Sequence, residues 1–101
     1  LSGARTFFPD PWPKKRHHRR RLITAPFAEA VSTRVAVGGF WHIATDWPDY
    51  ALGIEETVAA STLWRGGVIP RPESRPMTRY ERRGLAAGRE PIDLWFERVA
   101  T

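Results

Sequence analysis

Short apolar segments alternate along this chain with longer stretches in which apolar residues recur every three or four positions. Four of the short segments predict β-strands, at residues 5–8, 40–44, 63–65 and 92–99. The first, Arg5 to Phe8, stops at Pro9, which has no N–H for a further ladder bond. The second follows Gly38-Gly39 and ends just before Asp46. These boundaries indicate short strands of one sheet.

Three longer stretches predict α-helices, and each begins with a cap or a favourable first turn. Thr24 offers a capping hydroxyl, with Pro26 in the first turn, where a missing N–H costs nothing. Pro48 takes the same place in the second helix. Thr78 and Glu81 have the spacing of a capping box at the start of the third. We expect these helices to span residues 24 to 36 or 37, 46 to 60, and 78 to about 87. The segment 14–21 is expected to be a loop or a short helix.

The order strand, helix, strand, helix, strand, helix, strand is that of an α/β fold. The crossovers imply parallel strands, and the last strand is free to run antiparallel. In open α/β sheets, ligands bind beyond the carboxyl ends of the strands. Asp10 follows the first strand and Asp46 follows the second. Both acids are therefore expected at the binding edge of the sheet.

Composition narrows the class of protein. A chain of 101 residues with 42% hydrophobic residues suffices for one small globular domain. There is no cysteine, which excludes disulfides, zinc–thiolate sites and cysteine nucleophiles. No apolar run approaches the length of about 20 residues that a membrane span needs, and no signal peptide is visible. We expect no membrane partner and a cytoplasmic location.

The positive charge is concentrated in one segment. Residues 14–21 hold six of the sixteen Lys and Arg, so the rest of the chain has ten basic against eleven acidic residues. The net charge of +5 therefore comes wholly from this cluster. Directly before it stand Asp10, fixed between two prolines, and Trp12. A fixed acid and an aromatic ring beside a dense positive patch suggest chemistry on a nucleobase held by its phosphate backbone.

Simpler explanations exist for each of these features. A basic run is often a solvated surface or a localisation tag, and an Asp before Pro usually initiates a turn. Asp46 could serve only as the cap of the helix that follows it. His17 and His18 are adjacent and point apart in most conformations, and His42 lies within a strand, so these three are not expected to bind a metal.

Four blocks together resemble the signature of bacterial tRNA guanine-N7 methyltransferases, and they cover essentially the whole chain. The first is Phe7-Phe8-Pro9-Asp10-Pro11-Trp12 with Lys14-Lys15-Arg16-His17-His18 and Arg20-Arg21-Leu22. The others, in order, are Ala44-Thr45-Asp46-Trp47 with Tyr50; Arg75-Pro76 with Thr78-Arg79-Tyr80-Glu81-Arg82-Arg83-Gly84; and Asp93-Leu94-Trp95-Phe96-Glu97-Arg98.

The resemblance implies a Rossmann-like, class I methyltransferase that transfers a methyl group from S-adenosylmethionine to N7 of a guanine in the tRNA variable loop. It makes Asp10 the active-site acid near the methyl donor, which is both a catalytic and a cofactor-binding role. Substrate contacts are implied for Lys14, Asp46, Thr78, Arg79, Tyr80 and Glu81. The remaining cations of the basic run, Lys15, Arg16, Arg19, Arg20 and Arg21, are expected on the RNA backbone.

The chain departs from the family pattern at its start. The glycine-rich cofactor loop of the family lies upstream of the first block and is absent, so residues 1–101 resemble the C-terminal half of one methyltransferase domain. We therefore expect this chain to be inactive alone. Two other interpretations stay open: a non-catalytic basic RNA-binding module, and a fragment that pairs with another copy through the open edge of its first strand.

The chemistry assigns the two acids different tasks. Guanine N7 carries a free lone pair, so methylation removes no proton, and the base becomes cationic as the methyl group arrives. Asp10 is expected to stabilise that developing charge rather than to act as a base. Asp46 can accept from both guanine N1–H and the exocyclic amine, which distinguishes guanine from adenine.

Overall fold

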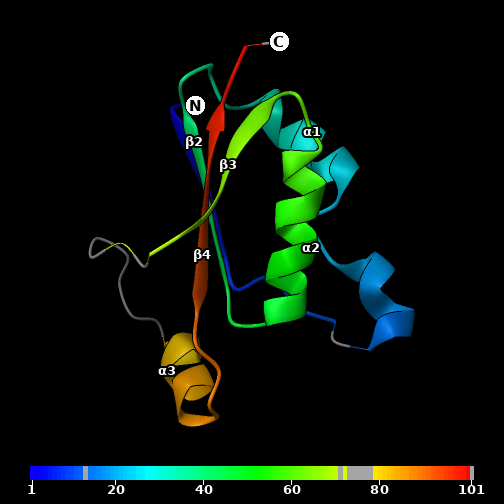
Figure 1. The fold of residues 1–101 in the computed structure, drawn as a ribbon, viewed down its shortest axis with the longest axis vertical. Helices are drawn as coiled ribbons and strands as arrows, with labels where there is room; N and C mark the ends of the chain where they lie inside the picture. Colours follow the sequence, from blue (N-terminus) through cyan, green and yellow to red (C-terminus); the bar gives the residue numbers. More distant parts are fainter. Residues whose placement is uncertain (13, 71, 73–78, 101) are drawn as a thin grey trace.

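The computed structural model describes residues 1–12, 14–70, 72 and 79–100, which form four strands, three α-helices and one 3-10 helix (Figure 1). The strands are β1 (Gly3–Phe7), β2 (Phe40–Thr45), β3 (Trp64–Ile69) and β4 (Ile92–Arg98). The helices are η1 (Lys15–Arg20), α1 (Ala25–Ser32), α2 (Pro48–Ala59) and α3 (Arg79–Ala86). None of the helices in the described ranges is long and apolar enough to cross a membrane.

The strands form a single sheet in the order β1-β2-β4-β3. β1 pairs with β2 in parallel, and β4 runs antiparallel to both of its neighbours, β2 and β3. The first three strands therefore point the same way, and the last strand is inserted between two of them against their direction. This confirms the predicted α/β fold with an antiparallel last strand. β1 lies at one edge of the described sheet, as expected.

Two helix starts form as their residues predict. Thr24 is the N-cap of α1 and its hydroxyl accepts from the Phe27 N–H at 3.4 Å. Proline occupies the first turn of both α1 and α2. The simpler explanation of Asp46, that it only caps α2, is wrong: the N-cap is Trp47, with no side-chain capping bond.

Two elements differ in length from the prediction. α1 ends at Ser32, four or five residues before the predicted end, because the following segment pairs elsewhere: Ala36 N–H donates to the Leu1 carbonyl and Gly38 N–H to the Arg98 carbonyl, each at 2.8 Å. β3 continues to Ile69 rather than ending at residue 65, because β4 offers it backbone partners along its whole length. The predicted short strand is therefore a full member of the sheet.

The core lies between the sheet and the helices α1 and α2. Trp41 and Phe96 are fully buried on the side of the sheet that meets Ile54 of α2. The Trp64 indole N–H donates to the Ala28 carbonyl at 3.1 Å and so joins β3 to α1. The described part measures 41 × 35 × 17 Å, and its shortest dimension fits one sheet with one layer of helices.

The opposite side of the sheet carries a second, smaller aromatic group. Phe40 of β2 stacks on Trp95 of β4, with ring centroids 4.5 Å apart. Beside them His42 Nε2 lies 2.7 Å from the Asp93 carboxylate, and both side chains are almost fully buried. The Phe7 ring meets His42 edge-on at 4.9 Å. This buried polar pair joins β2 to β4 and supports the end of β1.

Candidate active site

A turn with unusual backbone geometry follows β1 at the carboxyl edge of the sheet. The parallel pairing continues one step beyond the strand, where the Phe8 N–H donates to the Ala44 carbonyl at 2.7 Å. Phe8 and Trp12 have φ angles of 51° and 41°, in a region that costs an aromatic residue on the order of 1–3 kcal/mol. Between them Asp10 is exposed. The turn therefore displays this carboxylate to solvent on a strained backbone.

The basic run forms η1 and its flanks, and most of its charge faces solvent. Lys14, Lys15, Arg16, Arg19 and Arg20 are all exposed. The Trp12 ring lies against this helix, edge-on to His17 at 5.7 Å and beneath the Arg20 guanidinium at 5.2 Å. The exposed cations thus stand directly beside the turn that carries Asp10, an arrangement suited to an anionic polymer.

Arg21 is the exception within the basic run, because only 10% of its side chain is exposed. Its Nε donates to the Pro11 carbonyl at 2.5 Å, and one terminal nitrogen lies 2.9 Å from the Asp49 carboxylate. The guanidinium also lies over the Tyr50 ring, 4.6 Å from its centroid. Tyr50 in turn accepts from the Ile23 N–H through its hydroxyl, at 3.1 Å.

These contacts change the acidity of two side chains. The hydrogen bond from Arg21, with further help from its charge and that of His18, holds the pKa of Asp49 below its usual value. Burial raises the pKa of Tyr50, so its hydroxyl stays neutral. Arg21 and Asp49 are therefore a charged pair at ordinary pH, although 54% of the Asp49 side chain meets water.

Asp46 follows β2 at the same edge and is 2% exposed. Its Oδ2 accepts from Arg89 Nε at 3.0 Å, and the Arg89 guanidinium lies 5.4 Å from the centre of the Trp47 ring. A Cβ on Gly84 of α3 would come within 2.4 Å of the same oxygen, so glycine lets α3 approach the acid closely. The Trp47 indole N–H is buried with no acceptor among the described residues.

The block predicted to line the site lies on α3. Thr78 lies outside the described residues, and Arg79 and Tyr80 are described only as the first backbone positions of the helix. Glu81 is 1% exposed and stands three residues before Gly84, so the two share a helix face. The helix that carries Arg79 to Glu81 therefore packs against Asp46 at the end of β2.

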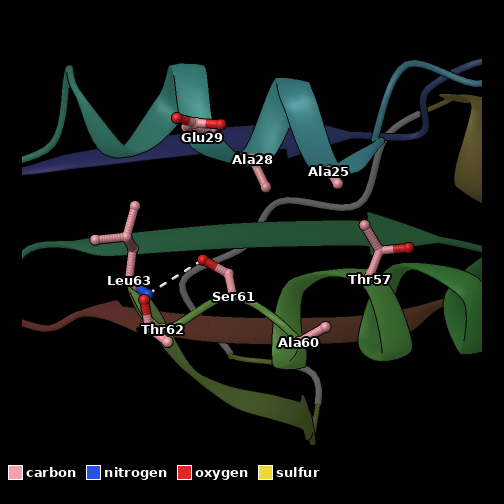
Figure 2. Close-up of a pocket in the computed structure, with 8 residues that line it drawn as sticks. All are labelled: Ala25, Ala28, Glu29, Thr57, Ala60, Ser61, Thr62 and Leu63. Carbon is pink, nitrogen blue, oxygen red and sulfur yellow. Dashed lines mark hydrogen bonds between the residues drawn. The ribbon is translucent and has the colours of Figure 1, made fainter. Parts of the chain in front are cut away.

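A cavity of about 400 Å³ opens beside Asp46. It is lined by Asp46, Pro48, Gly88, Arg89, Glu90, Pro91 and Ile92. A second cavity, of about 390 Å³, lies between α1 and the end of α2 (Figure 2). Its lining includes Glu29, Thr57 and Ser61, whose hydroxyl accepts from the Leu63 N–H at 3.1 Å. It lies at the opposite end of α2, a helix of 12 residues that is about 18 Å long, and so belongs to a different part of the molecule.

The structure adds residues that pattern reasoning did not single out. Arg89 pairs with Asp46 from 43 positions away, and no local motif marks it. Asp49 could have been noticed as the acid in the first turn of α2. No group of three or more potential metal ligands occurs among the residues that the structure describes.

Comparison with known proteins gives consistent matches. The model of a family described as "Putative methyltransferase" matches residues 1–94. The tRNA (guanine-N(7)-)-methyltransferase of Bordetella pertussis (strain Tohama I) is 48% identical over 102 residues, covering 98% of this chain and 40% of the relative. Its counterpart in Nocardioides sp. (strain JS614) is 50% identical over 98 residues, covering 97% and 40%. That of Shewanella piezotolerans (strain WP3) is 46% identical over 104 residues, covering 98% and 44%.

The chain thus spans about two-fifths of the length of these curated relatives, and it matches their C-terminal part. The inserted antiparallel strand and the parallel strands beside it are consistent with part of a class I methyltransferase sheet.

The lowered pKa of Asp49 generates a prediction about stability. A carboxyl whose pKa is lowered in the folded state stabilises the fold above its unfolded pKa, and that contribution is lost as the pH falls through the folded pKa. Asp49→Asn should therefore reduce the free energy of unfolding near pH 6 by roughly 0.2–1 kcal/mol, typical of a solvent-screened pair. The difference from the unmodified chain should shrink between about pH 5 and pH 2.

Urea unfolding of this chain at several pH values measures that difference. Glu56→Gln is the matched control, because it removes an exposed carboxylate from the same helix, and no ion pair with Glu56 is present among the described residues. If the free energies of unfolding of Asp49→Asn and the unmodified chain differ by the same amount at every pH, the pair with Arg21 contributes nothing to folding.

Proposed function

Since this chain belongs to the methyltransferase family whose model matches residues 1–94, we propose that it forms the substrate side of a tRNA-modifying enzyme. In this proposal the enzyme transfers a methyl group from S-adenosylmethionine to N7 of a guanine in the tRNA variable loop. The observation that carries it is the shared sheet edge: Asp10 and Asp46 follow two paired parallel strands, beside five exposed cations.

The residues of this chain fit the methyl-accepting side of such a reaction. S-adenosylmethionine supplies the methyl group on a positively charged sulfur when it is bound. Asp10 is the residue of this chain proposed to stand near it, at the exposed turn after β1. The cofactor-binding part is proposed to lie outside this chain, which agrees with the share of the relatives that the match covers.

Asp10 would act through its charge. As the guanine N7 lone pair forms the new bond to carbon, the base gains a positive charge, which a carboxylate within a few ångströms stabilises. The strained turn favours this role, because a fixed carboxylate needs little rearrangement at the moment of reaction. No proton has to leave N7, so a base is unnecessary.

Asp46 would select the base by exchanging partners. In this structure Arg89 donates to one of its oxygens, and the acid is almost fully buried. A guanine that entered the neighbouring cavity could offer N1–H and its amine in place of the Arg89 donor. Arg89 is one-third exposed, so its guanidinium could turn to water and remain charged. Adenine has no matching pair of donors.

The function is tested in a chimera in which this chain replaces the matching C-terminal part of the Bordetella pertussis relative. With tRNA and labelled S-adenosylmethionine, we expect the chimera to methylate and the 101-residue chain alone to be inactive. Mass spectrometry of the digested tRNA should identify N7-methylguanosine.

Turnover by the short chain at a rate like that of the chimera would contradict the proposed division of the domain. If the chimera and the short chain bind tRNA but neither methylates it, while the unmodified relative is active, the chain is a basic RNA-binding module instead.

The basic run generates a prediction about salt dependence. Replacing Lys14, Lys15, Arg16, Arg19 and Arg20 by Ala should weaken tRNA binding, because exposed cations release counterions from phosphates. The slope of log affinity against log salt is negative. Each lost contact should make it less steep, by about 0.7 for a single strand and about 0.9 for a duplex. Filter binding at several salt concentrations measures the slope.

Arg65→Ala is the control for this experiment, because Arg65 is 77% exposed but lies on β3, away from the basic run. It should leave the slope nearly unchanged. A five-residue variant with the slope of the unmodified protein would make the run a solvated surface without RNA contact.

Replacing each of the two acids in the chimera is predicted to change a different kinetic quantity. Asp10→Asn removes the charge that offsets the forming cation, so it should slow single-turnover methylation more than it weakens tRNA binding. Asp46→Asn loses a two-oxygen acceptor, so it should raise the apparent KM and relax the choice of base. Loss of a charge-assisted contact is on the order of 1.5–3 kcal/mol, or roughly ten- to a hundredfold.

Single-turnover kinetics and tRNA binding measured on both variants separate these effects, and circular dichroism checks that both are folded. A normal chemical step in Asp10→Asn would reduce Asp10 to a turn residue and remove the proposed electrostatic role.

A further inference from the structure

One arginine of the basic run is placed differently from its neighbours. Arg19 and Arg20 are exposed, whereas the Arg21 side chain is nine-tenths buried. Its guanidinium contacts three separate groups: the Pro11 carbonyl at 2.5 Å, the Asp49 carboxylate at 2.9 Å and the face of the Tyr50 ring at 4.6 Å. Its donors are therefore directed into the protein, where they are poorly placed to reach a phosphate.

The partners of Arg21 join the two halves of the candidate site. Pro11 directly follows Asp10 in the strained turn after β1. Asp49 and Tyr50 belong to the first turn of α2, the helix that begins just after Asp46. The one guanidinium therefore connects the turn that carries one acid to the helix start that follows the other.

The turn needs such an attachment. Phe8 and Trp12 have positive φ angles, which aromatic residues keep only where surrounding contacts hold them. Among the residues that the structure describes, one hydrogen bond from outside reaches the backbone of residues 9–12, and it is the one from Arg21 to the Pro11 carbonyl. Two prolines limit the internal motion of the segment but cannot fix where it stands relative to α2.

We propose that Arg21 is a positioning residue, which fixes the distance between the Asp10 carboxylate and the Asp46 end of the site by clamping the Asp10 turn to the first turn of α2. The proposal rests on the proposed methyl transfer. It also removes Arg21 from the set of RNA backbone contacts expected from the sequence. A small displacement of a catalytic group slows chemistry without changing substrate affinity in proportion.

The alternative is that Arg21 contacts a phosphate, like the cations around it. The two roles predict different methylation rates for Asp49→Asn. Asp49 is an acid beside the basic run, so its removal should preserve or strengthen tRNA binding through electrostatics. If Asp49 instead secures Arg21, the same change slows methylation while binding holds.

The test uses the chimera and three single variants: Arg21→Lys, Asp49→Asn and Arg65→Lys. Lysine keeps the charge but cannot donate to Pro11 and Asp49 at once with a planar fork. Arg21→Lys and Asp49→Asn should each slow single-turnover methylation about ten- to a hundredfold, with tRNA affinity changed less than about threefold. The combined variant should be little slower than either one.

One lysine control defines the comparison. Arg65→Lys replaces a distant exposed guanidinium that is paired with Glu97 and should match the unmodified chimera. Equal methylation by Arg21→Lys and Arg65→Lys would overturn the proposal, as would normal methylation by Asp49→Asn.

A second readout does not depend on methylation. With ¹⁵N-labelled tryptophan, the Trp12 indole resonance should shift or broaden in Arg21→Lys and Asp49→Asn, and stay in place in Arg65→Lys, because Trp12 ends the clamped turn. An unmoved Trp12 resonance overturns the clamp even if the chimera proves inactive. If the unmodified chimera does not methylate N7 while Trp12 moves, the clamp stands and the proposed function fails.

Discussion

The architecture depends on the backbone pairing of β4 between β2 and β3. Without that strand β3 has no neighbour in the described sheet, and Leu94 and Phe96 leave the core. β4 also supplies Asp93 to His42, and its Arg98 carbonyl and N–H pair with Gly38 and Gly39 just before β2. An antiparallel strand inserted late in the chain therefore aligns the parallel strands whose carboxyl ends form the candidate site.

Residues close together in the sequence predict most of the helices and strands, but they do not predict which strands pair with one another. The Thr24 cap, the prolines in two first turns and the alternation of elements follow from residues close in sequence, so they could be predicted from it. The sheet order could not, because periodicity does not say which strands are neighbours. β3 was predicted too short because its two glycines, Gly66 and Gly67, weaken the strand pattern until β4 supplies partners.

The candidate site shows the same division. The alternation of strands and helices along the sequence was enough to predict that Asp10 and Asp46 lie at one edge of the sheet, since they follow two strands that pair in parallel. Their surroundings depend on distant residues: Arg89 reaches Asp46 across 43 positions, and Gly84 lets α3 close over it. Exposure also differs between the acids, because Asp10 stands on a turn whereas Asp46 is enclosed by α3 and the loop after it. A motif of residue types contains none of this information.

Within the basic run, positively charged side chains have two different roles, because some face solvent and one is buried. Six cations in eight positions are indistinguishable by composition, yet five face water and one faces the protein. Exposed cations add affinity roughly in proportion to their number, so any one of them is replaceable by another. A buried guanidinium with three directed contacts is not, because its effect lies in geometry. A run that combines the two can therefore attract an anionic polymer and hold one carboxylate in place, and only the second task requires arginine at a fixed position.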